Sequence, residues 1–498
     1  MRAALALAGL LITGCASLPS PMSTPAPSPL PDADGCVRWL QALDAEVAHA
    51  GVRDAGQAPV PGFPMLRADR LAAASRPAAD ADASAFDAWV EHLRSLDESA
   101  RRVEVANLPP SSPLLQSAGA RAATLQRVAD CSRRLADALR ADPRTRATLT
   151  QRVQVPDSYS TALRVAGAYA LARGPFFAGV SRWQADQVRA LQDTASQPFA
   201  GVSLVPQPQA VLPSALHQPP PGAPPLDDAA AERLLARHAP RFDVQRRGAF
   251  DDIGTPAWGD DGRLRVDTAA PVVYQRVAHT LVQGRLLTQL VYTLWFPERP
   301  LAGPLDLLGG PLDGLVVRLT LGPDGRVRML DTIHACGCYH LFFPAPGVSL
   351  RPGAPQDEEW AFVPAPLPAA GPGERLVLRI ESGTHYVVDL RTAADTDAGT
   401  ATTNAQGGPP RTPYARRPET DLLRLPLPQG GTRSLYGPDG LVPGTERGER
   451  FLFWPMGIAS PGAMRQWGHH ATAFVGRRHF DDPDLLDRRF TGLVDLAP

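Results

Sequence analysis

Ten residues that end at His340, Asp-Thr-Ile-His-Ala-Cys-Gly-Cys-Tyr-His, hold the densest group of side chains able to do chemistry. In a regular strand, side chains alternate between two faces, so one face would carry His334, Cys336, Cys338 and His340. At about 3.3 Å per residue, the two histidines would stand roughly 20 Å apart. Zinc–ligand bonds are only about 2.0–2.3 Å long, so a straight strand cannot bring all four to one metal ion. Gly337 changes this, because an interior glycine favours a kink or bulge that brings its neighbours together.

Three interpretations of this run are open. The first is a disulfide between Cys336 and Cys338, which needs Cβ atoms about 3.8 Å apart and therefore a sharp bend. A strained short bridge is easily reduced, so this disulfide would be redox-active. The second is a metal site in which both thiolates and His334 or His340 bind zinc or copper. The third is structural, with two small thiols packed inside a buried strand.

The same residues are the candidate catalytic set if the protein is an enzyme. Cys336 or Cys338 would serve as thiol nucleophile or metal ligand, with His334 or His340 as the base. Seven of the eleven histidines lie in the C-terminal half of the chain: His279, His334, His340, His385, His469, His470 and His479. A lone strand histidine is more often a core residue that makes one hydrogen bond, so this clustering indicates a site only if several of them converge.

The amino terminus has the layout of an export signal. Arg2 supplies a positive charge, and residues 3–12 form an apolar run too short to span a bilayer core of about 30 Å. The sequence Ile-Thr-Gly-Cys at 12–15 resembles the lipobox of bacterial lipoproteins. The resemblance implies cleavage after residue 14 and acylation of Cys15. Position 16 is Ala and not the Asp that marks inner-membrane retention in some bacteria, so the outer membrane is favoured. An ordinary secretory signal with an incidental cysteine is the alternative.

Acylation of Cys15 leaves four cysteines, and an even number in an oxidising compartment suggests pairing. Cys36 and Cys131 both fall on apolar faces of expected helices, so a bridge between two packed helices is predicted. Two buried free thiols are the alternative. If that bridge forms, Cys336 and Cys338 remain as the second possible pair.

Composition excludes several classes of enzyme. The chain has 498 residues, a formal net charge of −1 and no lysine, so all 50 basic residues are arginine. Without lysine there is no Schiff-base chemistry and no P-loop. The motifs H-E-x-x-H, G-x-S-x-G and C-x-x-C are absent as well. A net charge near zero gives no field that attracts nucleic acid, so no nucleic-acid partner is expected.

Hydrophobic periodicity divides the chain. After a signal at 1–14 and a tether rich in Pro, Ser and Ala at 15–34, apolar residues recur at helical spacing and predict a small helical bundle over 35–202. A Pro-rich linker is predicted over 203–226. From 227 to 498, paired apolar runs flank turn signals at Gln283-Gly284, at 322–325 and at Ser382-Gly383. The fold class is therefore α+β, with a helical bundle followed by an antiparallel sheet or barrel-like domain.

The sequence thus predicts a lipid-anchored protein of the outer membrane that faces the periplasm. Its role is expected to be binding or structural, with the membrane as partner through the lipid and an envelope protein or polymer as the other candidate partner. No cofactor is expected, and zinc or copper enters only with the metal interpretation. The alternative is a periplasmic enzyme, or a redox or metal-binding protein, with its thiol and histidine site around residues 334–340.

Overall fold

The computed structural model describes residues 26–77, 82–194, 197–207, 220–223, 226–394 and 410–495. The predicted signal and Cys15 lie outside this part of the chain. Its α-helices are α1 Cys36–His49, α2 Arg70–Ala74, α3 Ala83–Asn107, α4 Ala120–Ala141, α5 Pro143–Arg152, α6 Thr161–Ala166, α7 Tyr169–Thr194, α8 Asp228–His238 and α9 Arg450–Phe453. Its 3-10 helices are η1 Ala33–Gly35, η2 Pro113–Leu115, η3 Ala249–Asp251, η5 Glu419–Arg424 and η6 Trp454–Met456.

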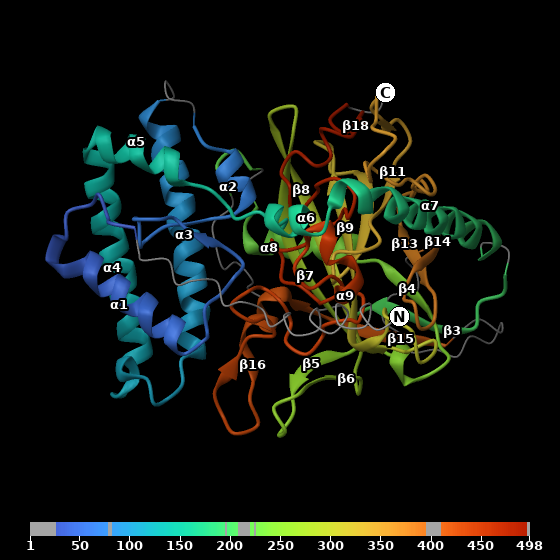
Figure 1. Ribbon diagram of the computed structural model, residues 1–498, viewed down its shortest axis with the longest axis horizontal. Coiled ribbons are helices and arrows are strands. Elements are labelled where there is room, and N and C mark those ends of the chain that lie inside the picture. Colours follow the sequence, from blue (N-terminus) through green and yellow to red (C-terminus); the bar gives the residue numbers. More distant parts are fainter. Residues whose placement is uncertain are drawn as a thin grey trace, which may run out of the picture.

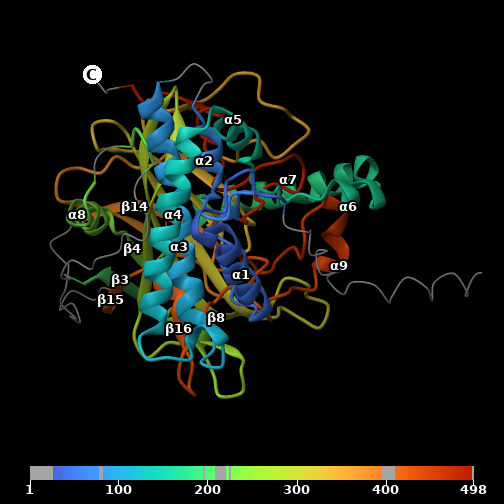
Figure 2. The same cartoon turned by 90° about the vertical axis from the view of Figure 1, so that its left-hand side faces the viewer.

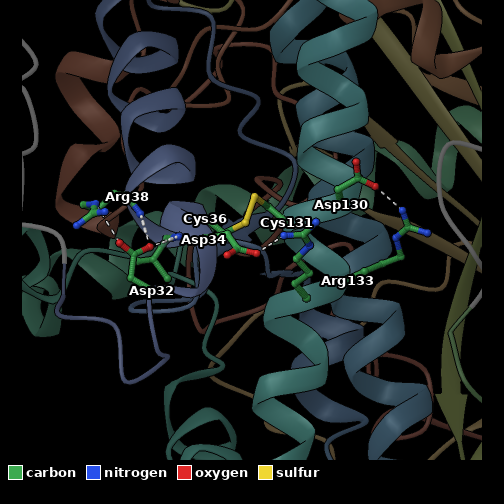
Figure 3. Close-up of a disulfide and its surroundings, with 9 residues drawn as sticks. Asp32, Asp34, Cys36, Arg38, Asp130, Cys131 and Arg133 are labelled. Carbon is green, nitrogen blue, oxygen red and sulfur yellow. Dashed lines mark hydrogen bonds and ion pairs between the residues drawn. A yellow bond between two sulfur atoms is a disulfide. The ribbon is translucent and has the colours of Figure 1, made fainter.

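Helices α1 to α5 form a bundle at one end of the molecule (Figure 1). Their apolar stripes meet in one core, in which Leu40, Leu93 and Leu135 are fully buried. The predicted disulfide between Cys36 and Cys131 is present and joins α1 to α4 (Figure 3). The periodicity of the sequence predicted these helices because each buries one face.

One ten-stranded sheet dominates the rest of the chain and curls into a half-barrel (Figure 1). In spatial order its strands are β11 Leu341–Pro344, β10 Val327–His334, β9 Gly310–Leu321, β8 Arg285–Arg299, β7 Val272–Val282, β15 Arg411–Pro418, β3 Gly201–Pro206, β4 Arg241–Gln245, β13 Glu374–Ile380 and β14 Val387–Ala394. Short strand pairs accompany it: β1 Ala58–Pro59 with β2 Arg67–Ala68, β5 Thr255–Trp258 with β6 Leu264–Asp267, β12 Ser349–Leu350 with β18 Phe490–Thr491, and β16 Leu425–Pro426 with β17 Thr432–Arg433.

The three predicted hairpins are confirmed. β7 and β8 pair across Gln283-Gly284, where both residues have positive φ, as a tight two-residue turn requires. β9 pairs with β10 across residues 322–325, and β13 with β14 across the loop that holds Ser382-Gly383. The α+β class is also confirmed, but the sheet is mixed, because β15 runs parallel to β3 and β7, and β13 runs parallel to β4.

The predicted domain boundary is displaced in the structure. The helical domain was expected over 35–202 and the linker over 203–226, but β3 lies inside the sheet, between β15 and β4. Helix α7 also belongs to the sheet, since Gln187 on it donates a hydrogen bond of 2.6 Å to the Val387 carbonyl of β14. The helical bundle therefore ends with α5. The strand partners of β3 lie far along the chain, so local composition could not reveal that it is a strand.

The bundle lies beside the sheet, with α2 and α3 on the side that faces it (Figure 1), and Figure 2 shows the bundle in front of the sheet. Asn107 at the end of α3 donates to the Leu423 carbonyl of η5 at 2.9 Å. Arg70 of α2 pairs with Asp481 at 3.3 Å. Within the described ranges, no helix is long and apolar enough to cross a membrane.

Candidate functional site

The run from His334 to His340 forms a tight turn between β10 and β11, as the glycine predicted. The Gly337 amide donates to the His334 carbonyl at 2.7 Å, and the His334 amide donates to the Cys338 carbonyl at 3.0 Å. Gly337 has a φ of +91°, and a Cβ at this position would lie 2.8 Å from the Ala471 carbonyl oxygen. Glycine is therefore required both by the backbone conformation and by the close approach of another segment.

The two cysteines of this turn are free thiols in the structure, so the predicted Cys336–Cys338 disulfide is not formed. A bridge across one intervening residue requires a strained geometry. Here the turn is closed by backbone hydrogen bonds instead, and the Cys338 amide donates to Cys336 Sγ at 3.4 Å. The two side chains are only 7% and 8% exposed.

The surroundings of these thiols are unfavourable for nucleophilic chemistry. Both lie in a cluster with Trp295, Leu312 and Met464. The hydrogen bond from the neighbouring thiol of Cys336, together with burial, raises the pKa of Cys338 well above its ordinary range. Because the thiolate is the reactive form, Cys338 is not poised to act as a nucleophile at neutral pH.

The two predicted histidines lie in different environments. Nε2 of His340 lies 2.8 Å from a carboxylate oxygen of Asp331, which also binds Arg318 at 2.6 Å. Burial lowers the pKa of His340 to about 3, so its neutral ring donates to that carboxylate. His334 faces Asp313 instead, 3.6 Å away. Among the described residues, no three His, Cys, Asp or Glu side chains are placed to hold one metal ion.

A buried chain of acids and histidines extends from His334. Asp313 lies 2.7 Å from Nδ1 of His385, and Nε2 of the same ring lies 3.6 Å from Asp251. The His385 ring also stacks on Phe296 with centroids 3.8 Å apart. Burial lowers the pKa of His385, but its bonds to the two carboxylates outweigh this effect and leave the pKa raised. Burial raises the pKa of Asp313, yet the charge and hydrogen bonds of both histidines hold it well below its ordinary range.

Beyond His334, the buried cluster continues to a carboxyl group without an ion-pair partner. Arg299 lies over the rings of Tyr339 and Tyr386, 5.7 and 5.4 Å from their centroids. Glu449, 5% exposed, forms no ion pair within 4 Å among the described residues. Burial raises the pKa of Glu449 to about 7, although three arginines oppose the shift. The groups of this cluster are enclosed.

A cleft with a volume of about 210 Å³ lies between the helical bundle and the sheet. Its walls come from both parts and include His92, Ser99, Ala100 and Val103 of α3, Gln275 to His279 of β7, and Asp54, Gln57, Tyr436, Gln466 and Trp467 of the loops. Cavities at the junction of two structural units are common ligand sites. None of these residues belongs to the predicted set at 334–340.

The arginines that line the cleft are already paired. Arg70 binds Asp481 at 3.3 Å, and Arg276 binds Glu419 at 3.1 Å. The carboxylate of Asp54 accepts a hydrogen bond of 2.6 Å from the Gln466 amide. An anionic ligand would therefore have to compete with these carboxylates for the arginines.

In the described part of the chain, three unsatisfied groups of the cleft are neutral, and a fourth, Nε of Arg276, is cationic. Gln57 Oε1, Gln466 Oε1 and His279 Nε2 are buried and have no hydrogen-bond partner among the described residues. Burial lowers the pKa of His279 to about 4, so this ring is uncharged at neutral pH. Buried polar atoms are nearly always hydrogen-bonded in native proteins, so these atoms indicate water or a ligand in the cleft. Trp467 adds an aromatic wall.

Sequence reasoning missed the cleft because its residues are scattered. Asp54 and Gln466, for example, are 412 residues apart in the sequence and are joined by a side-chain hydrogen bond. Nothing in the sequence around His279 distinguishes it from the other six histidines of the C-terminal half. Comparison of the chain with protein-family models, with curated proteins and with solved structures gave no match.

Proposed function

We propose that this protein is a lipid-anchored envelope protein that binds one neutral, hydroxyl-rich unit, such as a sugar residue of an envelope polymer, in the cleft between the bundle and the sheet. The lipobox-like sequence at 12–15 supports the anchor, which would be attached at Cys15 and would hold the protein at the outer membrane facing the periplasm. The unpartnered neutral polar atoms of the cleft support the ligand.

The chemistry of these atoms selects the ligand class. Amide oxygens accept hydrogen bonds from hydroxyl groups, and a neutral imidazole nitrogen donates or accepts one. Tyr436 and the part of the Trp467 ring that the Arg276 guanidinium does not cover offer aromatic contacts that suit the apolar faces of a sugar ring. Arg70 and Nη1 of Arg276 are paired with Asp481 and Glu419, so a carboxylate or phosphate would have to compete with these acids, although Nε of Arg276 has no partner among the described residues. A cavity of about 210 Å³ is smaller than drug-sized sites of about 300–1,000 Å³, so it suits one sugar ring.

Binding in the cleft is favoured over thiol catalysis by the positions of the two sets of groups. The Cys338 thiol is enclosed and its pKa is raised, whereas the cleft has open volume and unsatisfied partners. A ligand gains most where it satisfies groups that the protein leaves unpaired.

Titration calorimetry tests the ligand. The chain 16–498, which contains every described residue, is titrated with N-acetylglucosamine, its β-1,4-linked disaccharide and, as a charged comparison, glutarate. We expect heat from a sugar and none from glutarate. His279→Leu should weaken sugar binding about tenfold, the effect of one lost hydrogen bond of about 1.4 kcal/mol.

His238→Leu is the matched control. The Nε2 atom of His238 is also buried without a partner, and burial lowers its pKa to about 4 as well, but it lies on α8 outside the lining of the cleft. Absence of heat from both sugars at millimolar concentration, or equal losses in the two variants, would overturn the proposed ligand class.

Metabolic labelling tests the anchor separately. Bacterial cells that express the full chain with tritiated palmitate should label the protein, and Cys15→Ser should abolish the label. Ser17→Ala, two residues away, should leave it unchanged. Persistence of the label in Cys15→Ser refutes acylation at this cysteine.

A further inference from the structure

We infer that one apolar face of the protein rests on the lipid surface itself. The face is formed by α6, the first half of α7, α9 and the loop 301–307, and we call it the α9 apolar surface. The inference rests on the proposed function in one respect only: the lipid anchor at Cys15 would hold this face near a bilayer.

Exposed apolar side chains are concentrated here. Eight large hydrophobic side chains are exposed in the described part of the chain, and only Leu350 lies elsewhere. The other seven, with their exposed fractions, are Val165 75%, Leu171 80%, Leu301 63%, Leu305 91%, Leu307 41%, Phe451 61% and Leu452 60%. Scattered exposed leucines need no explanation, but a contiguous group marks an interaction site.

The segments that carry these residues are in contact. Arg164 on α6 donates to the Met456 carbonyl of η6 at 2.9 Å, directly after α9. The rings of Phe176 on α7 and Phe453 on α9 meet edge to face with centroids 4.9 Å apart. The amide of Glu449, the residue before α9, donates to the Leu307 carbonyl at 3.1 Å. Figure 2 shows α6, α7 and α9 together on one side of the molecule.

The arginines around this face suit an anionic bilayer, and the carboxylate of Asp306 in the loop 301–307 is occupied by the amides of Ala302 and Leu308. Arg182 follows Leu171 by eleven residues, which places it only about 20° away around an ideal helix, and it is exposed. Arg450 begins α9 beside the exposed Phe451 and Leu452. Neither arginine has an ion-pair partner among the described residues. Phenylalanine and leucine flanked by unpaired arginine is the composition of interfacial helices, where the cation meets lipid phosphate.

The length of the tether is compatible with this placement. The carbonyl of Pro27, near the start of the described chain, accepts a hydrogen bond from Arg152 at the end of α5. The eight residues between Arg152 and the start of α6 at Thr161 limit the distance between these two Cα atoms to about 30 Å. The twelve residues from Cys15 to Pro27 span up to about 40 Å. An acyl chain on Cys15 can therefore enter the bilayer on which α6 lies.

Vesicle flotation with chain 16–498, which lacks Cys15, tests the face without the anchor. Vesicles of phosphatidylethanolamine and phosphatidylglycerol at three to one are compared with vesicles of phosphatidylcholine alone. We expect the protein to float with the first set and less with the second. The quadruple variant Val165→Ser, Leu171→Ser, Phe451→Ser and Leu452→Ser should bind at least about tenfold more weakly.

Leu350→Ser is the matched control, because it removes the exposed hydrophobic residue that lies outside this face and should leave flotation unchanged. Equal flotation of the parent and quadruple proteins overturns the inference, and so does absence of flotation of the parent. Sedimentation velocity without lipid checks for a second copy as occupant. The membrane assignment is also overturned if the parent forms a dimer and does not float, while the quadruple variant is a monomer. Palmitate labelling at Cys15 is independent of all these results, so failure of the face and failure of the anchor can be told apart.

Discussion

Glu449 makes the stability of the protein depend on pH. Its carboxyl group is 5% exposed and lies against Gly462, where a Cβ would be 2.0 Å from Oε1. Burial raises its pKa from 4.5 to about 7, while Arg299, Arg447 and Arg465 act in the opposite direction without cancelling the shift. Between pH 4.5 and about 7, the Glu449 carboxyl group is therefore mostly protonated in the folded protein and mostly ionised in the unfolded chain.

The sign and the size of the effect follow from this difference. Below about pH 4.5 both states are protonated and the carboxyl group is fully accommodated. As pH rises from 4.5 to 7, the unfolded chain releases a proton that the folded chain retains, so the free energy of unfolding falls. With pKa values of 4.5 and about 7, the loss between pH 5.5 and pH 8 is about 2 kcal/mol.

The perturbation is Glu449→Gln, which keeps the shape of the neutral acid. Urea unfolding at pH 5.5 and pH 8 gives the free energy of unfolding of the variant minus that of the parent. This difference should grow by about 2 kcal/mol from the lower to the higher pH. Comparison with the parent removes the contribution of all other titrating groups.

Glu446→Gln is the control, because Glu446 is exposed and only three residues away. It should follow the parent at both pH values. The reasoning fails if Glu449→Gln and the parent lose stability in parallel as the pH rises. In that case the ionised carboxylate must be accommodated by the arginines as well as it is by water.

Three further outcomes are expected. Replacement of Cys36 and Cys131 by Ala should lower the free energy of unfolding by about 4–5 kcal/mol, because the bridge closes a loop across 95 residues, and denaturation under non-reducing conditions measures it. Asp331→Asn should cost about 3–5 kcal/mol by leaving the buried Arg318 without its carboxylate, whereas Asp324→Asn, in a more exposed pair with Arg328, should cost less than about 1 kcal/mol. A maleimide should label Cys336 and Cys338 slowly in the native protein and both rapidly in guanidinium, and rapid native labelling would contradict their enclosure.

The parts of the fold that the sequence predicted are those specified locally. The hairpin between β7 and β8 follows from the Gln283-Gly284 dipeptide, because only a few residue types adopt two successive positive φ angles easily. The disulfide partners could be recognised because each cysteine lies on the apolar stripe of its own helix. The bend at Gly337 was predicted by the same kind of local argument.

The parts that were missed are specified by distant partners. Strand β3 looks like the start of a Pro-rich linker, and it becomes a strand only because β15 and β4 supply its hydrogen bonds. Helix α7 reads as a member of the bundle, yet Gln187 and Trp183 on it contact the sheet and its loops. Apolar periodicity shows that a face is buried but not against which element.

The difference between local and distant partners also distinguishes the run from His334 to His340 from the cleft. Cys336, Cys338 and His340 attract attention because they are close in sequence, but the fold gives each of them a local role in closing a turn or balancing a buried charge. Nδ1 of His340 also lacks a hydrogen-bond partner among the described residues, but this ring is buried and does not line the cleft. The cleft joins His279 with residues hundreds of positions away, and its amide oxygens and ring nitrogen are left unpaired. Unsatisfied hydrogen-bonding capacity beside open volume is therefore the observation on which we base the proposed binding site at the junction between bundle and sheet.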